Sequence, residues 1–382
     1  MDFALTEEQT AIQDMALEFA RERVAPNADH WDETSHFPVD ELRETAPLGM
    51  AAIYVDEAHG GSGLSRLDGA LIFEALAYGC PTFSAYLSIH NMVTWMVSKY
   101  ANDEQRAEWM GPLTSMAWLA SYCLTEPGCG SDASALKTRA EKRGDTYVLN
   151  GTKQFISGAG ATDFYFVFAR TSDDGPHGIS AFVVMKDTPG LSFGQNERKM
   201  GWNAQPTRQV MFEDVEVPAS HRVGREGHGF RFAMSGLDGG RINIGACSTG
   251  AAWSALDKSK TYAFERTAFG QPIGDFQAMQ FKIADMATEL ESAQLMLYRA
   301  ADALDRGDPK ATMYSAMAKR FSTDFGFKIA NEALQVHGGY GYLKDYGLEK
   351  IVRDLRVHQI LEGTNEIMRV VVARHVLGGN RG

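Results

Sequence analysis

The chain has 382 residues, of which 44% are hydrophobic and 23% are charged, and its formal net charge is −12. One hydrophobic core rarely keeps growing in a chain of this length, so two or three domains are expected. The acidic balance argues against a nucleic-acid-binding protein, because phosphate contacts need clustered Lys and Arg. A phosphorylated small ligand stays compatible, since a few local basic groups can hold one.

The cysteines indicate a reducing compartment. Cys80, Cys123, Cys129 and Cys247 form no CxxC pair and have no histidine at ligand spacing, so no metal site is expected. The opening MDFALTEEQTAIQDM is acidic and lacks the layout of a signal peptide, and no apolar run reaches membrane-spanning length. We therefore expect a cytoplasmic protein without membrane insertion, or a mitochondrial matrix protein if the chain is a processed eukaryotic form.

Residues 1–117 show helical periodicity and predict an N-terminal all-α domain. Thr6 and Gln9 have the spacing of a capping box, and apolar residues then recur on one helical face until Pro26. Two further helices are predicted at DGALIFEALAYG and FSAYLSIHNMVTWMVSKYA.

Residues 118–227 predict a middle β domain, because the period drops to two and turn residues become dense. In YVLNGTKQFI, two short apolar segments flank Asn150-Gly151, which predicts a hairpin. Further strands are expected at DFYFVFAR, GISAFVVM and RQVMFEDVEV. Consecutive strands without intervening helices favour an antiparallel sheet or barrel.

Residues 228–382 predict a C-terminal four-helix bundle of long helices. One helix is expected to begin near Gly236, within GLDGGRINIGA. In a later helix, a stripe of Met313, Met317, Phe321 and Phe325 is assigned to the bundle core. The order helices, strands, helices gives an α+β fold class.

The segment EPGCGSDA contains a GxGxxA pattern formed by Gly128, Gly130 and Ala133. A dinucleotide-binding turn needs a strand before this pattern, a helix at it and a parallel strand after it. Pro127 precedes the glycines and a predicted hairpin follows them, so we reject a Rossmann site. The segment is instead interpreted as a loop whose amides, with the Ser131 hydroxyl, could approach a phosphate or a flat ring.

The segment ERTAFGQPIGDFQAMQ places Arg266, Phe269 and Gln277 just before a long amphipathic helix. A cation, an aromatic ring and an amide at a helix entrance suit a pyrophosphate joined to an aromatic base. The alternative is a surface arginine beside a loop phenylalanine that packs inward.

Two carboxylates lie four residues apart in HQILEGTNEIMR. Thr364 and Asn365 can cap a helix, and Glu366 then lies in its first turn, where the helix dipole favours negative charge. Glu362 follows two apolar residues and precedes a glycine. It is therefore either a surface residue of no consequence or a base in an apolar setting.

Five motifs, in family order and at family-like separations, resemble the acyl-CoA dehydrogenase family over essentially the whole chain. They are YCLTEPGCGSD, NGTKQFISGAG, ERTAFGQPIGDFQAMQ, QVHGGYGY and LEGTNEIMR. Three longer stretches look most like the branch that acts on isobutyryl-CoA in valine catabolism: GWNAQPTRQVMFEDVEVP, GLDGGRINIGACSTGAA and GYGYLKDYGLEKIVRDLRVHQILEGTNE.

The resemblance implies an FAD-dependent homotetramer that oxidises a short branched acyl-CoA between its α and β carbons. Isobutyryl-CoA would become methacrylyl-CoA, with electrons passed to an electron-transfer flavoprotein. Alternatives are the same reaction on 2-methylbutyryl-CoA or butyryl-CoA, and an oxidase that passes electrons to oxygen. An alternative from another class is a non-catalytic helical scaffold that binds flavin or CoA.

The resemblance also implies the contacts of cofactor and substrate by motif position. The flavin is expected to contact Tyr122, Leu124, Thr125, Ser131, Phe155 and Ser157. Many relatives carry Trp and Thr at the last two positions. An aromatic ring for stacking and a hydroxyl group are therefore both retained here, although the residues differ. The pyrophosphate and adenine are expected across a subunit interface, at Arg266, Phe269, Gln277, Gln335 and Gly339, with Thr364 and Glu366 near the same cofactor. The acyl-CoA is expected to contact Ser131, Asp238, Arg241 and Gly363.

The family places its catalytic base at one of two positions, and this chain has a carboxylate at only one of them. On the helix that carries LDGGR the chain has Gly240, which cannot accept a proton, so the resemblance implies Glu362 as the base. Glu362 would take the α-proton while the β-hydrogen leaves as hydride to the flavin. Desolvation would strengthen this base, and its backbone N–H, with a flavin ribityl hydroxyl, would meet the charge on the thioester oxygen.

Overall fold

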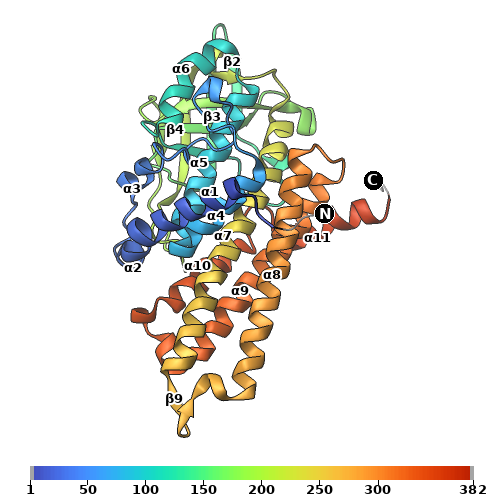
Figure 1. Cartoon of the computed structure of the whole chain (residues 1–382). Coiled ribbons are helices and arrows are strands. Elements are labelled where there is room, and N and C mark those ends of the chain that lie inside the picture. Colours follow the sequence, from blue (N-terminus) through green and yellow to red (C-terminus); the bar gives the residue numbers. More distant parts are fainter. Residues whose placement is uncertain (1–3, 379–382) are drawn as a thin grey trace.

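A computed structural model of the chain describes residues 4–378, and its elements follow the order helices, strands, helices (Figure 1). The N-terminal helices are α1 (Glu7–Phe19), α2 (Ala28–Thr34), α3 (Val39–Glu44), α4 (Arg66–Gly79), α5 (Pro81–Tyr100) and α6 (Asp103–Thr114). The strands of the middle region are β1 (Ala120–Cys123), β2 (Arg139–Arg143), β3 (Thr146–Ser157), β4 (Phe164–Arg170), β5 (Ile179–Met185), β6 (Leu191–Phe193), β7 (Thr207–Pro218) and β8 (Arg222–Val223). The C-terminal elements are α7 (Gly229–Glu265), the short strands β9 (Thr267–Ala268) and β10 (Gln271–Pro272), α8 (Gln277–Asp305), α9 (Ala311–His337), α10 (Leu348–His358) and α11 (Asn365–Val376).

The predicted N-terminal signals are confirmed. The backbone N–H of Gln9 donates to Thr6 Oγ1 at 3.1 Å, and the backbone N–H of Thr6 donates to Gln9 Oε1 at 3.1 Å, which completes the capping box of α1. The two helices expected after it are α4 and α5. Within residues 4–378, no helix combines the length and apolar character needed to cross a membrane.

The middle strands form one eight-stranded sheet in the order β6-β7-β3-β2-β4-β5-β8, with β1 attached to β4. Most pairs are antiparallel, as expected, but β1 and β2 each run parallel to β4. The chain between β1 and β4 contains a loop and the β2–β3 hairpin. This connection is long enough for a parallel return, which a tight turn cannot provide.

The hairpin predicted at Asn150-Gly151 is wrong, because β3 runs straight through these residues. The turn lies instead at residues 144–145, between β2 and β3. The Asn150 side chain donates to Asp214 Oδ1 and accepts from the Asp214 backbone N–H, both at 2.9 Å. The register between β3 and β7 shifts at this point, so Asn-Gly marks a β-bulge rather than a chain reversal.

α7 begins at Gly229, seven residues before the predicted start, and runs for 37 residues. Its glycines lie where other helices approach. A Cβ added at Gly250 would lie 1.9 Å from the Glu74 carbonyl oxygen of α4, and one at Gly245 would lie 2.8 Å from Leu297 of α8. Tertiary packing therefore offsets the low helix propensity of glycine along this helix.

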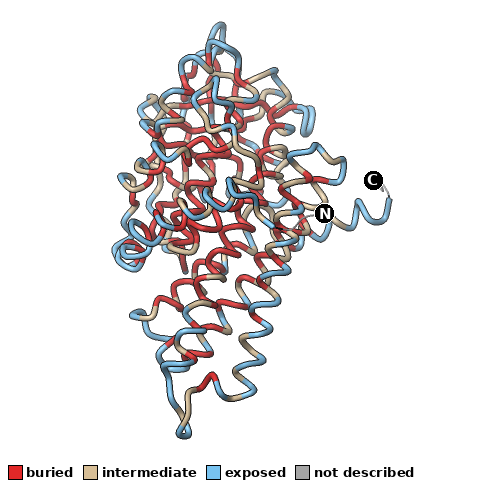
Figure 2. The backbone as a smooth tube through the Cα atoms, viewed as in Figure 1, coloured by how far each residue is buried: buried red, intermediate tan, exposed pale blue. Residues whose placement is uncertain are grey.

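The N-terminal and C-terminal helices share one hydrophobic core. It joins Phe73 and Leu76 of α4 to Ile244 of α7 and Leu297 of α8. The buried residues gather in the body of the molecule, whereas the ends of α7, α8 and α9 near β9 are mostly half-buried or exposed (Figure 2). The domain boundaries expected near residues 118 and 228 stay predictions.

The Met and Phe stripe assigned to the core of α9 is only half-buried, so that prediction is wrong. The buried face of α9 consists mainly of small and polar residues, among them Ser315, Ala316, Ala318, Lys319, Ser322, Thr323, Gly326 and Ala330. α9 packs closely on α7, since a Cβ at Gly326 would lie 2.9 Å from the Ser248 carbonyl oxygen. Large side chains do not fit in so narrow a contact, and the four residues of the stripe stay half-buried.

A buried ion pair anchors the glycine-rich loop after β1. The Lys153 ammonium of β3 donates to Glu126 Oε1 at 2.8 Å and to the Leu124 carbonyl oxygen at 3.1 Å. The Glu126 carboxylate also accepts from the backbone N–H groups of Lys137 at 2.6 Å and Thr138 at 2.9 Å. Both ends of the loop are thereby tied to one carboxylate, which is only 7% exposed.

We expect Lys153→Met to destabilise the protein by about 3–5 kcal/mol, because it leaves the Glu126 charge buried without its cation. Thermal unfolding followed by circular dichroism measures the effect. The control is Arg143→Met, which breaks the exposed Arg143–Glu141 pair and should cost about 1 kcal/mol or less. Equal shifts in the two variants would contradict the role given to the buried pair.

Candidate active site

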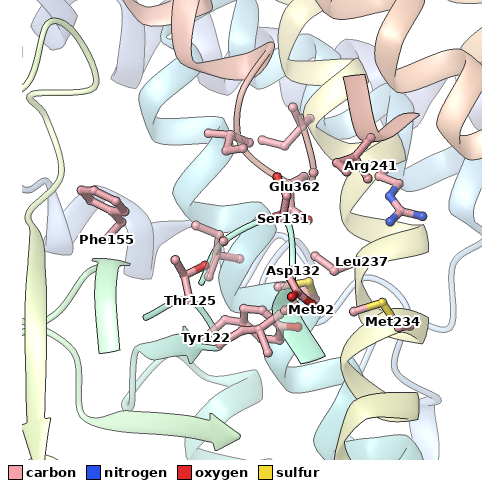
Figure 3. Close-up of a pocket in the computed structure, with 18 of the residues that line it drawn as sticks. Met92, Tyr122, Thr125, Ser131, Asp132, Phe155, Met234, Leu237, Arg241 and Glu362 are labelled. Carbon is pink, nitrogen blue, oxygen red and sulfur yellow. The ribbon is translucent and has the colours of Figure 1, made fainter. Parts of the chain in front are cut away.

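A cavity of about 480 Å³ lies between α5, β1, β3, α7 and the segment that joins α10 to α11 (Figure 3). Its apolar lining includes Ile89, Met92, Leu124, Met234, Leu237, Ile244 and Leu361. Its polar lining includes Tyr122, Thr125, Ser131, Asp132, Ser157, Arg241 and Glu362. The walls therefore come from segments far apart in the sequence.

Glu362 reaches this cavity from a strained backbone. Its φ is +56°, and that of Gly363 is +89°. A left-handed conformation costs a residue with a side chain about 1–3 kcal/mol and is found most often at functional sites. No hydrogen bond engages the Glu362 backbone N–H within the described part of the chain, so this donor is available to a ligand.

The Glu362 carboxylate lies against the bare backbone of α7 at Gly240. A Cβ added at Gly240 would lie 2.4 Å from Glu362 Oε2. The second position at which the family places a base is therefore not only without a carboxylate; it has no room for any side chain while Glu362 holds this place.

The environment of Glu362 raises its basicity. Burial raises the pKa of Glu362 to about 7, against the opposing charges of Arg241 and Lys319. Oε2 is shielded from solvent and has no hydrogen-bond partner among residues 4–378. Arg241 Nε, in the same lining, is likewise buried without a partner. A buried polar atom calls for a hydrogen-bond partner, and here a polar ligand in the cavity can supply one.

Arg241 and Asp238 form an ion pair at 2.6 Å on α7. Arg241 lines the cavity of Glu362, whereas Asp238 lines a neighbouring cavity with Arg66 and Lys99. The second oxygen of Asp238 accepts from the Thr312 hydroxyl at 2.8 Å. Asp238 therefore orients Arg241 and lies outside the cavity itself.

The glycine-rich loop and β3 form a wall suited to a flat ring. Gly128 and Gly130 have open space where a Cβ would lie, so a ligand can approach the backbone there. Phe155 is 63% exposed at φ +58° and lies at the edge of the cavity in Figure 3. An exposed ring on a strained backbone, beside the hydroxyls of Thr125 and Ser157, fits the stacking and polar edge contacts that a flavin needs.

A wall of the cavity is fixed by a chain of hydrogen bonds that the sequence did not reveal. The indole N–H of Trp202 donates to His358 Nε2 at 3.1 Å, so Nδ1 carries the histidine proton. His358 Nδ1 lies 2.7 Å from the Ser248 hydroxyl, which donates to the Ile244 carbonyl oxygen at 3.0 Å. Burial lowers the pKa of His358 to about 3, so this ring stays neutral.

The remaining predicted cofactor residues lie outside this cavity. Arg266, Gln335 and Gly339 line a separate open pocket of about 420 Å³ near the end of α9. Phe269 is 97% exposed on the turn between β9 and β10, and Gln277 is exposed at the start of α8. The structure of one chain thus separates the two predicted halves of the cofactor site.

Thr364 and Glu366 contribute to the start of α11. The Thr364 hydroxyl accepts from the Ile367 backbone N–H at 3.3 Å, which confirms the predicted cap. Glu366 lies in the first turn with its side chain exposed. Neither residue is among those that line the cavity of Glu362.

The apolar lining cannot be recognised in the sequence because its members look like ordinary core residues. Met92 lies within a helix that reads as buried throughout, and Trp202 lies in an irregular segment without periodicity. His358 precedes Glu362 by four residues, but its partner is 156 residues distant, so no local pattern connects them.

Comparison with known proteins agrees with this geometry. Three models of the acyl-CoA dehydrogenase family match the chain: the N-terminal domain over residues 6–117, the middle domain over 121–215 and the C-terminal domain over 227–377. The chain is 52% identical to the mitochondrial isobutyryl-CoA dehydrogenases of Dictyostelium discoideum and Bos taurus, over 97% and 98% of this chain and 90% of each relative.

Solved structures share the whole fold. Butyryl-CoA dehydrogenase from Megasphaera elsdenii superimposes with a TM-score of 0.96 at 37% identity, over 99% of this chain and all of that one. The FAD complex of PigA superimposes with a TM-score of 0.95 at 30% identity, over 99% of this chain and all of that one.

The open glycine loop, the exposed Phe155 and the unpartnered polar atoms around Glu362 fit the group that this comparison implies. Together with the three matching domains, they identify the chain as a member of the acyl-CoA dehydrogenase family, an oxidoreductase with acyl-CoA dehydrogenase activity whose cofactor is FAD.

Proposed function

We propose that the protein oxidises isobutyryl-CoA to methacrylyl-CoA, a step of valine catabolism, and passes the electrons to an electron-transfer flavoprotein. The observation that carries the proposal is the half-buried Glu362 side chain, whose Oε2 is shielded from solvent and has no partner within residues 4–378, at a cavity with largely apolar walls. The choice of acyl chain is supported by the 52% identity to two isobutyryl-CoA dehydrogenases.

Glu362 acts as the base in this proposal. Oε2 needs a proton donor, and the α C–H of a thioester bound in the cavity can serve as one. The raised pKa of Glu362 brings its basicity close to that required near neutral pH. The unengaged N–H of Glu362 is free to donate to the thioester oxygen as negative charge develops there.

FAD supplies the acceptor for the β-hydrogen, which leaves as hydride. Tyr122, Leu124, Thr125, Ser131, Phe155 and Ser157 would hold its ring at the cavity wall. Arg241 contributes a fixed positive charge, held by Asp238, beside the reacting thioester. Ser131 and Gly363 lie in the same lining and would contact the substrate.

A second copy of the chain would supply the other cofactor contacts. Four aromatic side chains are each at least 60% exposed near the ends of α7, α8 and α9 beside β9 and on the adjoining turns, which is unusual for a monomer. They are Phe264, Phe269, Phe281 and Tyr342. The pocket of Arg266, Gln335 and Gly339 lies in the same region, and we propose that the adenine half of FAD binds there across a homotetramer interface. Thr364 and Glu366 would lie near this cofactor.

We further propose the cytoplasm, or the mitochondrial matrix for a processed eukaryotic form, as the compartment in which the protein works. Two relatives of this chain are named as mitochondrial proteins.

We expect Glu362→Gln to purify yellow and tetrameric but to lose reduction by isobutyryl-CoA by about 10²–10⁴-fold, because the amide cannot accept the α-proton. Anaerobic bleaching of the flavin absorbance measures this step. Chemical reduction by dithionite is the control and should be unchanged. Normal bleaching by isobutyryl-CoA would refute the role of Glu362, and a colourless wild-type protein would favour the scaffold alternative.

The rate of reduction by substrate should rise from pH 6 to pH 8, with a midpoint near the pKa of about 7 of Glu362. Below this pKa the carboxyl group is protonated and cannot take the α-proton; above it the carboxylate can. Stopped-flow absorbance at saturating isobutyryl-CoA gives the profile. A rate that is constant or falls over this range would contradict the assignment.

Isobutyryl-CoA should have the highest kcat/KM in a panel that includes 2-methylbutyryl-CoA and butyryl-CoA. 2-Methylbutyryl-CoA has one methylene more, and one methylene in an apolar pocket changes this ratio by about 10–200-fold. Butyryl-CoA is an isomer of isobutyryl-CoA and tests the recognition of the branch. The assay uses electron-transfer flavoprotein as acceptor, and oxygen consumption in parallel tests the oxidase alternative. A preference for either competitor would keep the reaction class and reject the proposed substrate.

A further inference from the structure

A buried lysine on α9 holds the segment that carries Glu362. The Lys319 side chain is inaccessible to solvent. Its ammonium donates to the Gly363 carbonyl oxygen at 2.7 Å and to Asn365 Oδ1 at 3.0 Å. Within residues 4–378 it forms no ion pair with any carboxylate, so its hydrogen bonds are directed at this one segment. A buried ammonium without an ion-pair partner is costly and calls for a specific role.

The same face of α9 holds both ends of the segment. The Asn365 amide donates to Thr323 Oγ1 at 2.9 Å and to Asp324 Oδ1 at 2.7 Å. The Gln359 amide donates to Asp324 Oδ1 at 2.9 Å, and the Asn365 backbone N–H donates to the Gln359 carbonyl oxygen at 3.0 Å. Residues 359–365 are therefore closed into a loop and fastened to α9.

Glu362 and Gly363 lie between the hydrogen bonds at Gln359 and Asn365, and both have left-handed backbone conformations. For Glu362, which carries a side chain, such a conformation persists only when its surroundings impose it. The Lys319 side chain holds the carbonyl group of Gly363, the residue that follows this strained position. Without that contact, the loop has an unpaired carbonyl oxygen at the residue next to the base.

We propose that Lys319 is a positioning residue for the catalytic base: its ammonium holds the Gly363 carbonyl and the Asn365 side chain against α9, and so keeps the Glu362 carboxylate aimed into the cavity over Gly240. The inference rests on the proposed function for its catalytic consequence. The contact itself is a property of this chain.

Charge adds a second effect at the same place. Arg241 of α7 and Lys319 of α9 face Glu362 as cations, Tyr122 of β1 faces it as a phenol, and Cys247 of α7 faces it as a thiol. Lys319 is in turn faced by Glu362, Arg241, Asp324 and Glu366. Burial lowers the pKa of Lys319 to about 7, and the Glu362 carboxylate opposes this shift. Removing the cation should therefore raise the pKa of Glu362.

The test compares Lys319→Met, which removes the donor and the charge, with Lys319→Gln, which keeps a donor without the charge. The matched control is Lys328→Met, on the same helix, where the lysine pairs with Glu289 at the surface. Two readouts are taken from the FAD-loaded protein: amide hydrogen exchange in the peptide that spans residues 359–368, and stopped-flow reduction by isobutyryl-CoA across pH 6–9.

We expect Lys319→Met to lose exchange protection in this peptide and to reduce about 10²-fold more slowly at saturating substrate, because a displaced base costs rate rather than binding. Lys319→Gln should regain the protection and most of the rate at high pH. The rise of its reduction rate with pH should stay displaced to higher pH than in the wild type, since the positive charge is still missing. Lys328→Met should match the wild type in both readouts.

Wild-type protection and rate in Lys319→Met would overturn the proposal. So would a slow Lys319→Met whose loop exchange is unchanged, because charge alone would then explain the loss. If Lys319→Met does not fold, the test uses Lys319→Gln alone. Loss of protection from amide exchange in the loop of that variant would count against positioning by a hydrogen bond. Failure of the wild type to reduce with any acyl-CoA would refute the proposed function, and the exchange data would still decide the contact.

Discussion

The Glu362 carboxylate reaches the surface of α7 only because residue 240 is a glycine, since a Cβ there would lie 2.4 Å from Oε2. The position of α7 depends in turn on similar close contacts. The Glu74 carbonyl of α4 meets α7 at Gly250, and Gly326 of α9 meets the Ser248 carbonyl. Because these helices cannot separate or rotate without losing close packing, they hold the floor of the cavity rigidly beneath the loop that carries Glu362.

Buried charged groups at the cavity of Glu362 differ in their partners from two buried ion pairs elsewhere in the chain. The Lys153–Glu126 pair and the Lys350–Asp354 pair are both buried, and each cation is matched directly by a carboxylate. At the cavity, the Arg241 guanidinium pairs with Asp238, but its Nε and Oε2 of Glu362 have no hydrogen-bond partner within residues 4–378. An unpaired buried polar atom costs about 1–3 kcal/mol. At the cavity, a bound ligand can offset this cost.

In the proposed assembly, the two groups of predicted cofactor residues would contact one cofactor from two copies of the chain. Phe155 and the glycine-rich loop face the cavity of Glu362, whereas Arg266, Gln335 and Gly339 line a pocket near the end of α9. Phe269, almost fully exposed, lies in that second region. An exposed aromatic ring is unfavourable in a single chain, and in the proposed tetramer another copy and its cofactor would cover it.

The sequence by itself determined the order of helices and strands and the caps of α1 and α11, and through its family resemblance it predicted Glu362 rather than position 240 as the base. These features depend on residues a few positions apart or on motifs that recur as whole segments. Tertiary structure alone decided that Asn150-Gly151 forms a bulge and that α9 turns its small residues inward. It also brought Trp202 to His358 and Lys319 to Gly363. Periodicity shows that a helix has an apolar stripe, but which face becomes buried depends on how closely its neighbours approach, and that distance is set by side chains from elsewhere in the chain.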